Sequence, residues 1–294
     1  MFNTTHIDSF KVYLTEVRHA PVNTVSSYIR DITQFADFLE SGGKADFVGA
    51  TDDDVRVYIS QMEKNGRAPA TISRSIVSIK ALFGKLTADG ITANNPAAGI
   101  VSLGAQKKPP HILTSGEIER LMAEPDVKDP KGCRDKAMLE ILYATGIRVS
   151  ELITLDETDV NLVTGLVTCR NGKDRNIPIY TAAVKAVNHY LAFGRPKIAT
   201  PQETALFVNT TGGRLTRQGF WKILKNYTKS AGITGEITPQ TLRNSFAAHL
   251  LENGADIRSL QEMLGHADIS STQVFARTVK KHLKDIYNKA HPRA

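Results

Sequence analysis

The sequence predicts a mainly α-helical protein in two parts, a helical N-terminal domain and a mixed α+β domain that contains a small β-hairpin. Apolar residues recur at three- and four-residue steps through most of the first hundred positions, the period of amphipathic helices. A polar segment with two prolines follows, and further on two β-rich runs flank an Asn-Gly pair. We therefore expect domains at 1–103 and 113–294, joined by a linker at 104–112.

Three helices are expected in the first domain. Segments 24–40 and 69–86 each carry a broad apolar stripe, typical of helices that pack on a core. Between them, 52–66 predicts a shorter helix that closes on a glycine. The turn-forming run NNPAAGI at 94–100 then ends the last helix of this domain.

The second domain is expected to begin with a capped helix. Pro109 and Pro110 lack backbone donors and favour an extended linker. Directly after them, Thr114 and Glu117 have the spacing of a capping box. A helix at 133–146 then ends on a glycine.

The rest of the second domain combines strands and helices. The run 165–180 predicts a hairpin around Asn171 and Gly172, the strongest short hairpin signal in the chain. From Arg217 onward the pattern is helical again.

Charge is unevenly distributed along the 294 residues, whose formal net charge is +7. Residues 1–105 contain 10 Lys and Arg against 11 Asp and Glu, and the remainder contains 27 against 19. A basic second half indicates an anionic partner, most commonly nucleic acid, although a basic surface that serves solubility alone fits too.

Location is predicted from what the sequence lacks. We find neither a signal peptide nor an apolar run long enough for a membrane span, so no membrane partner is expected. Cys133 and Cys169 stand alone and suit a reducing compartment. These observations predict a cytoplasmic protein, associated with the nucleoid if its partner is DNA.

Four segments interrupt the helical patterns with polar residues: ATGIRVSEL, NGKDR, TPQTLRNSFAAHLL and EMLGHADISSTQVF. Arg148 follows a glycine turn, Arg243 lies among apolar helical residues, and His266 follows Gly265. Taken singly, a helical arginine is usually a surface charge, a Gly-His turn usually a helix end, and Asn-Gly usually a hairpin tip.

Together and in this order, the four segments resemble those of the tyrosine recombinases, specifically the Xer type that resolves circular chromosome dimers. The resemblance covers essentially the whole chain and includes NTVSSYIRDITQFADFLE, NPA, LTRQGFW and the terminal HPRA. It implies a SAM-like core-binding domain followed by a catalytic domain. A type IB topoisomerase uses a similar catalytic set, but the small helical first domain and the Xer-like runs argue against it.

The resemblance implies a chemistry without cofactors. Enzymes of this family attack one DNA strand with a tyrosine hydroxyl, form a 3′-phosphotyrosyl link and release a 5′-hydroxyl, so the phosphodiester energy is conserved and neither ATP nor metal is needed. Arg148 and Arg243 fall on two positions that bind the phosphoryl oxygens, for which a guanidinium fork is well suited. His266 falls on a third donor position.

The hairpin position that protonates the leaving 5′-oxygen can be aligned in two ways. Counting back from Pro178 places Arg170 there, whereas the Gly-Lys dipeptide favours Lys173. We predict Lys173, because lysine can shift its pKa and act as an acid. That both residues simply contact phosphate stays an alternative.

Two positions depart from the family pattern. Gln240 stands three residues before Arg243, where the family has histidine or lysine, and glutamine cannot move a proton. Phe275 stands in the position of the nucleophilic tyrosine. Tyr287 is no substitute, because twelve helical residues span about 18 Å. The chain is therefore expected to bind DNA without cleaving it, either through a deliberate Tyr→Phe change or as a natural, inactive DNA-binding regulator.

The implied partner is double-stranded DNA with a specific two-arm recombination site, held by both domains and the linker. The resemblance also implies a dimer on each site and a tetramer in synapsis, formed through a C-terminal helix at 279–290, with a second recombinase as a further candidate partner. The expected DNA contacts are Thr71, Ser73, Arg74, Lys80, Lys107, Lys108, Arg170, Arg217, Gln218 and Lys222.

Overall fold

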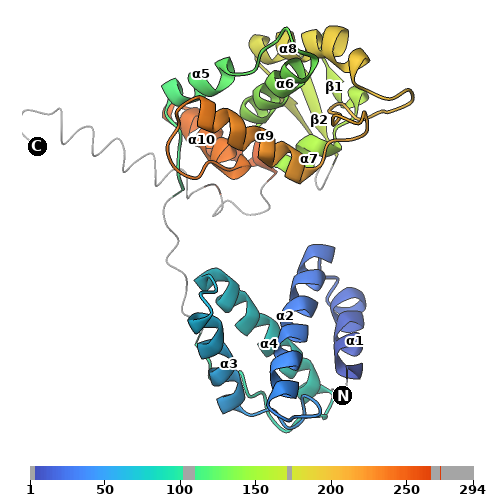
Figure 1. Cartoon of the computed structure of the whole chain (residues 1–294), viewed down its shortest axis with the longest axis vertical. Helices are drawn as coiled ribbons and strands as arrows, with labels where there is room; N and C mark the ends of the chain where they lie inside the picture. The colour runs from blue at the N-terminus through green and yellow to red at the C-terminus, as the bar shows by residue number, and fades with distance from the viewer. Residues whose placement is uncertain (1–3, 102–109, 171–173, 266–271, 273–294) are drawn as a thin grey trace, which may run out of the picture. The chain divides into compact units, whose positions relative to one another are not determined.

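The computed structural model describes residues 4–101, 110–170, 174–265 and 272. The chain divides into two compact units, Met1–Lys108 and Pro109–Ala294, whose elements are coloured blue to teal and green to red in Figure 1. The division falls inside the segment predicted as a linker, and the predicted domain limits themselves stay a prediction. Within the described ranges, no helix has both the length and the apolar character needed to cross a bilayer.

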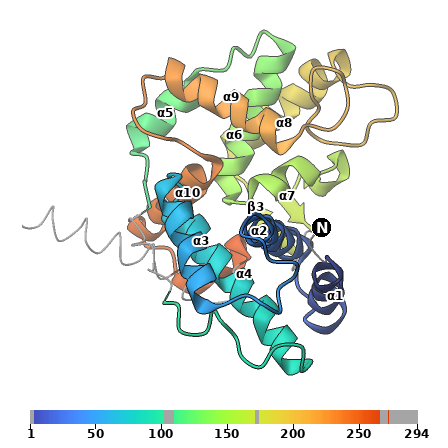
Figure 2. The same ribbon diagram turned by 60° about the horizontal axis from the view of Figure 1, so that its bottom comes forward.

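The N-terminal unit is helical throughout its described elements, as predicted, and Figure 2 looks nearly along one of its long helices, α2. The three predicted helices are confirmed as α2, α3 and α4, and a short helix, α1, precedes them with a π-helical turn, η1. The bounds are α1 (Thr5–Val12), η1 (Tyr13–Val17), α2 (Val22–Ser41), α3 (Asp52–Lys64) and α4 (Pro69–Ala88).

The core of this unit forms where the apolar stripes of α2 and α4 meet. Ile32 and Phe35 on α2 and Phe83 on α4 are fully buried. The Phe35 ring lies 6.3 Å from that of Phe83 and 5.1 Å from that of Tyr58 on α3. Each such large side chain contributes about 1.5–3 kcal/mol by leaving water, so the unit has a core of its own.

The C-terminal unit mixes many short helices with a small sheet, which confirms the predicted fold class. Helices occupy its start and its second half, and the strands lie between them. The bounds are α5 (Ser115–Ala123), α6 (Pro130–Thr145), α7 (Val149–Thr154), η2 (Glu157–Asp159), β1 (Val160–Asn161), β2 (Leu166–Cys169), β3 (Arg175–Pro178), α8 (Thr181–His189), η3 (Tyr190–Gly194), η4 (Arg195–Lys197), α9 (Arg217–Ser230), α10 (Pro239–Glu252) and α11 (Ile257–Leu264).

The sheet is antiparallel, with the strands in the order β1-β2-β3. Its register pairs Val167 with Ile177 and Cys169 with Arg175, so the predicted hairpin is confirmed in its two strands. The hairpin tip, 171–173, lies outside the described residues.

Helix α6 is the centre of this unit and is buried on nearly all sides. It begins where Asp129 accepts hydrogen bonds from two backbone amides and Pro130 takes the first helical position, three residues before the predicted start. Its buried Arg134 is 2.7 Å from Asp135 and donates to the Val208 carbonyl at 2.9 Å. These partners allow a charged residue in the core.

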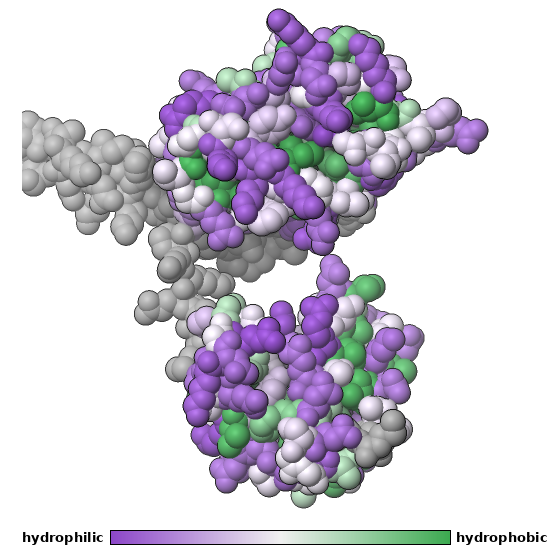
Figure 3. Space-filling model, in the orientation of Figure 1, coloured by the Kyte–Doolittle hydropathy of each residue, from purple (hydrophilic) through white to green (hydrophobic). Residues whose placement is uncertain are grey.

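On the face shown in Figure 3, both units present mostly hydrophilic side chains. Smaller apolar patches lie among these hydrophilic side chains on each unit. The apolar residues are instead gathered inside. The C-terminal unit holds one large core around α6 and a smaller cluster of Phe246, Ala247, Leu260 and Leu264 between α10 and α11.

Candidate active site

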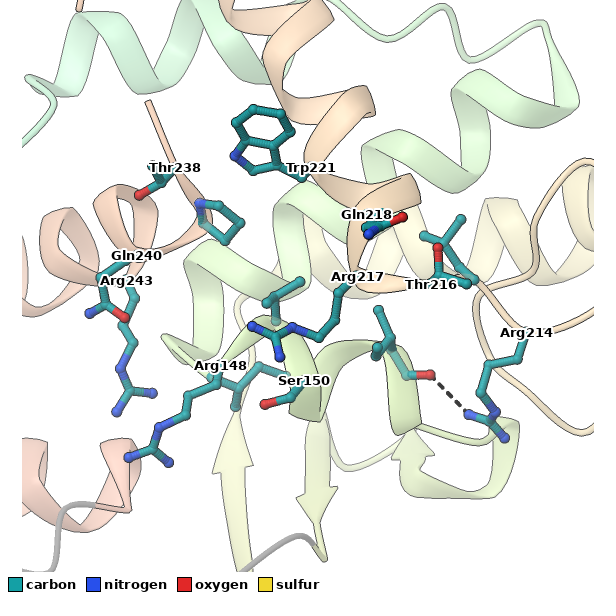
Figure 4. Close-up of a pocket in the computed structure, with 15 residues that line it drawn as sticks. Arg148, Ser150, Arg214, Thr216, Arg217, Gln218, Trp221, Thr238, Gln240 and Arg243 are labelled. Carbon is teal, nitrogen blue, oxygen red and sulfur yellow. Dashed lines mark hydrogen bonds between the residues drawn. The ribbon is translucent and has the colours of Figure 1, made fainter. Parts of the chain in front are cut away.

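An open pocket of about 1130 Å³ lies between α7, the start of α9 and the start of α10. Four arginines line it and no carboxylate does, but Arg214 is paired with Asp156, so Arg148, Arg217 and Arg243 are the cations that would attract an anion. Figure 4 shows the Arg148, Arg217 and Arg243 side chains reaching toward the same space from different elements, while Arg214 lies apart from them. The pocket is lined by Ile147, Arg148, Val149, Ser150, Ile153, Arg214, Leu215, Thr216, Arg217, Gln218, Trp221, Thr238, Pro239, Gln240 and Arg243.

Arg148 is placed by the turn that joins α6 to α7. Gly146 ends α6 with a φ of +59°, a conformation that favours glycine. A Cβ at this position would lie 2.2 Å from the Phe246 ring, so the close approach needs glycine as well. The Arg148 amide donates to Glu151 Oε2 at 2.7 Å, and its side chain, 48% exposed, reaches into the pocket.

Arg243 enters the pocket from α10 and is only 2% exposed. It donates to the carbonyl oxygen of Gly146 and, at 2.8 Å, to that of Leu264. Burial and then the nearby charge of Arg148 lower the pKa of Arg243 to about 10, so it keeps its proton at neutral pH. A buried cation near a second cation is stabilised by an anion between them.

Gln240 lies about one turn before Arg243 on the same helix. Its Nε2 donates to Asn244 Oδ1 at 2.9 Å, which fixes the amide at the pocket edge. The structure therefore brings together three of the residues predicted to be catalytic, Arg148, Gln240 and Arg243.

Helix α9 supplies the opposite side of the pocket. Two predicted DNA contacts, Arg217 and Gln218, line it, and Lys222 is exposed one turn further along the helix. Trp221, 41% exposed, lies beside them. Arg214, just before α9, donates to the Ile153 carbonyl at 3.0 Å, as the dashed line in Figure 4 shows.

Of the two candidates for the residue that protonates the leaving 5′-oxygen, the structure describes only Arg170. Arg170 Nε lies 2.8 Å from Asp159 Oδ1, and its side chain is 65% exposed. Lys173 lies outside the described residues, so the choice between the two stays a prediction. The predicted residues His266, Phe275, Lys107 and Lys108 also lie outside them.

The predicted DNA contacts on α4 are more tied to their own unit than we expected. Arg74 donates to both oxygens of the buried Asp31, at 2.9 and 2.8 Å, although 40% of its side chain stays exposed. Lys80 Nζ donates to the Ala98 carbonyl at 3.2 Å. Thr71 and Ser73 are half-buried on the same helix. Arg74 and Lys80 therefore stabilise the N-terminal unit, whatever else they contact.

Two buried charged residues were missed from the sequence, Glu151 and Arg175. The Arg175 side chain, 9% exposed, lies with Nη2 2.8 Å from Glu151 Oε1, and its Nε donates to the Met263 carbonyl at 2.8 Å. One signal could have found Arg175. It lies two residues before the buried Ile177 on β3, and alternate strand residues share a face.

Among the residues that the structure describes, no group of three His, Cys, Asp or Glu side chains could hold a metal ion. Cys133 and Cys169 are free and buried. Burial raises the pKa of the Cys169 thiol to about 11, which keeps it protonated.

The comparison with known families is decided by two sequence patterns. The pattern of the phage integrase family matches residues 111–282, and that of the N-terminal SAM-like domain of phage integrases matches residues 7–90. The chain belongs to the phage integrase family.

Relatives of this phage integrase family chain include Xer-type tyrosine recombinases of similar length. Tyrosine recombinase XerD of Oceanobacillus iheyensis is 44% identical over 295 residues, which cover 98% of each chain. Tyrosine recombinase XerC of Pelotomaculum thermopropionicum is 39% identical over 301 residues, again 98% of each. The predicted resemblance to Xer-type tyrosine recombinases is thus confirmed.

Solved structures of phage integrase family members and other recombinases share the fold. XerA recombinase matches with a TM-score of 0.55 and 28% identity over 98% of both chains. XerH site-specific recombinase bound to a palindromic difH substrate matches with a TM-score of 0.73 and 20% identity, over 95% of this chain and 83% of the other. At that identity the second match supports the fold alone.

Proposed function

We propose that the pocket holds one phosphodiester of a DNA duplex during site-specific recombination. The observation that carries the proposal is the convergence of Arg148, Arg217 and Arg243 on one open pocket that no carboxylate lines. Arg243 is fixed by two carbonyl oxygens, while Arg148 extends into the pocket. Their guanidinium groups would donate to the two non-bridging oxygens and stabilise the negative charge that grows on phosphorus.

The bond-breaking step needs a hydroxyl at position 275. In the reaction of the family, the hydroxyl oxygen attacks phosphorus, the bond to the 5′-oxygen breaks, and that oxygen leaves with a proton from Lys173 or a neighbouring donor. His266 would supply a third hydrogen bond to the phosphoryl group. Phe275 has no hydroxyl, so the chain as it stands binds the phosphate and stops before covalent bond formation.

DNA contacts beyond this phosphate would come from the exposed side of α9 and from both units. Arg217 and Gln218 are positioned at the pocket, and Lys222 follows them on the same helix. XerH, which shares the fold, was solved on a palindromic recombination site. We extend this to a two-arm site bound by two copies of the chain, and to a tetramer when two sites are brought together.

Assembly would depend on the segment 279–290, whose apolar stripe needs a partner surface. Deletion of residues 279–294 should leave binding to a half-site nearly unchanged and reduce dimer formation on a full site at least about tenfold. Gel mobility shifts on half and full sites measure both quantities. Unchanged cooperativity on the full site would refute this role.

Phe275→Tyr tests the proposed function directly. The duplex is selected from a randomised pool by the unaltered chain and then nicked beside each candidate phosphate in turn, so that cleavage traps the product. We expect a covalent protein–DNA adduct that survives SDS, with DNA attached to residue 275 by mass spectrometry, and no adduct with the unaltered chain. Adding Arg243→Gln should abolish the adduct.

A second candidate function is a DNA-binding regulator that never cleaves. Two departures favour it, Phe275 in place of the nucleophile and Gln240 in place of a residue that can move a proton. If Phe275→Tyr gives no adduct when the duplex is saturated with protein, the regulator is the better description.

A further inference from the structure

Arg175 belongs to a closed ring of contacts beside the pocket, which we call the arginine ring and of which Arg148 and Arg243 line the pocket. The ring runs from Arg148 to Glu151, then to Arg175 on β3, the end of α11, Arg243 on α10 and back through Gly146. The two buried arginines bind successive carbonyls of α11, Met263 and Leu264. The two guanidinium groups thereby join β3 and α10 to the end of α11 and to the segment from Gly146 to Glu151.

Glu151 is the one carboxylate in the ring, and its two oxygens have different partners. Oε2 accepts from the Arg148 amide at 2.7 Å and lies 3.9 Å from Arg148 Nη1. Oε1 lies 2.8 Å from Arg175 Nη2. Because Glu151 is buried, an unpaired charge there would be costly, and the Arg148 guanidinium is already within ion-pair distance of Oε2.

The other end of Arg175 lies against the turn that closes α11. Gly265 has a φ of +62°, and a Cβ there would lie 2.9 Å from Arg175 Cζ. The guanidinium is therefore packed on the backbone of Gly265 while its Nε binds Met263. Gly265 directly precedes His266 in the chain.

We propose that Arg175 is a positioning residue that holds one oxygen of Glu151, so that the carboxylate pairs no more closely with the guanidinium of Arg148 than the present 3.9 Å, and that fixes the end of α11, directly before His266 in the sequence. The proposal rests on the proposed phosphate site. With Arg175 in place, Glu151 is paired mainly with a residue that does not line the pocket, and the charge of Arg148 stays available to a phosphate. Without it, Glu151 competes with the phosphate for Arg148.

The test uses inorganic phosphate as the probe and the chain with Phe275 unchanged, so it depends on neither DNA nor cleavage. Phosphate is titrated while NMR follows the side-chain Nε–Hε signals of Arg148 and Arg243. Arg175→Met keeps much of the side-chain volume and removes the charge. We expect it to raise the Kd for phosphate at least about tenfold, as loss of a supporting residue does at other preorganised sites.

A second substitution separates competition from loss of structure. Glu151→Gln, added to Arg175→Met, removes the competing charge but keeps an acceptor for the Arg148 amide. The Kd for phosphate should return to within about threefold of that of the unaltered chain. Removing the Glu151 charge can restore binding only if competition with that charge caused the loss. No recovery in the double variant would overturn the competition with Glu151.

Arg134→Met is the matched control, since Arg134 is as buried as Arg175 and is also paired with a carboxylate, away from the pocket. It should lose comparable stability and keep its phosphate Kd. Equal loss of phosphate binding in Arg134→Met and Arg175→Met would overturn the proposal. If Arg175→Met does not fold, Arg175→Lys replaces it in the same comparison. We then expect a smaller loss of phosphate binding, which adding Glu151→Gln again reverses.

Cleavage by Phe275→Tyr separates this proposal from the proposed function. If the tyrosine variant forms no adduct but Arg175→Met selectively weakens phosphate binding, the recombinase function fails and the role of Arg175 stands. If the tyrosine variant cleaves and Arg175→Met in that background cleaves at the same rate and binds phosphate equally well, the role of Arg175 fails alone.

Discussion

Gly146 places Arg148 through both its backbone conformation and its missing side chain. Its φ of +59° turns the chain out of α6, and the space a Cβ would occupy is filled by the Phe246 ring. Gly232, after α9, has nearly the same φ, +64°, but nothing lies within 4 Å of its Cβ position. Replacing each glycine by alanine therefore separates the energetic cost of left-handed backbone strain from the cost of steric overlap with Phe246.

Gly146→Ala should lower the free energy of unfolding by about 2–5 kcal/mol, since left-handed strain adds about 1–2 and overpacking about 1–3. Gly232→Ala should lower it by about 1–2 kcal/mol, from strain alone. Urea unfolding followed by circular dichroism measures both. Equal losses would show that Phe246 moves aside without cost.

Gln240 sets the rate of cleavage in our proposal. In the Phe275→Tyr background, Gln240→His should speed adduct formation by about tenfold or more, because histidine can transfer a proton and glutamine cannot. Gln218→His, on α9 at the other side of the pocket, is the control and should change the rate less than about twofold. Single-turnover cleavage of the nicked duplex gives both rates, and equal effects would contradict the role of Gln240.

At the scale of elements, we expect helix α9 to contact DNA phosphates. The salt dependence of the Kd for DNA can count these contacts. Arg217→Gln should weaken DNA binding and reduce the slope of log Kd against log salt by about one. Lys185→Gln, an exposed change on α8, should leave the slope unchanged. A fluorescence anisotropy titration at several salt concentrations measures it, and an unchanged slope for Arg217→Gln would remove α9 from the interface.

The hairpin encloses a thiol that should be unreactive in the folded protein. With a pKa of about 11, only about one part in a thousand of Cys169 is thiolate at pH 8, and the residue is buried. Burial raises the pKa of Cys133 as well. Ellman's reagent at pH 8 should find almost no rapidly reacting thiol before denaturant is added and two afterwards. A fast thiol in the native state that Cys169→Ser removes would show that the strands open readily, because the other cysteine, Cys133, lies on α6.

Much of this organisation could be predicted from the sequence, because local signals decide it. Apolar periodicity gave the three long helices of the first unit, and Asn-Gly between β-rich runs gave β2 and β3. The capping box of Thr114 and Glu117 is present as predicted, with the Glu117 amide donating to the Thr114 hydroxyl at 3.3 Å. The two-residue strand β1 is too short to leave a pattern.

The candidate site was predicted less completely, because charge partners far apart in sequence leave no local signal. Arg148, Gln240 and Arg243 were found and do meet at one pocket. The pairing of Arg175 with Glu151 joins β3 to α7, and that of Arg74 with Asp31 joins α4 to α2. Such pairs depend on tertiary packing. The buried Arg175 was therefore missed, and Arg74 was predicted as a DNA contact without its pairing to Asp31.

At the scale of the whole molecule, the two units have separate cores. The apolar cluster of the first unit draws its buried members from residues 7–100 only. A fragment of residues 1–101 should therefore unfold cooperatively with helical circular dichroism, independently of the rest. A featureless melt would show that it needs the second unit.

Binding of DNA by the full chain should be dominated by charge. With a net charge of +7 and an excess of basic residues in the second half, affinity should fall at least about a hundredfold between about 50 and 200 mM salt. Isothermal titration or anisotropy at both salt concentrations measures this. An affinity that does not change with salt would contradict a phosphate-based interface.

Gly146 and Gly265 also limit how this chain can evolve. Each leaves a space that a side chain from another element occupies, Phe246 in one case and Arg175 in the other. A larger residue at either glycine position is tolerated only after its partner has become smaller, so the two positions of each pair should change together. Among related genes, those that carry a larger residue at 265 should lack the arginine at 175, and each lineage would have had to pass through the smaller side chain first.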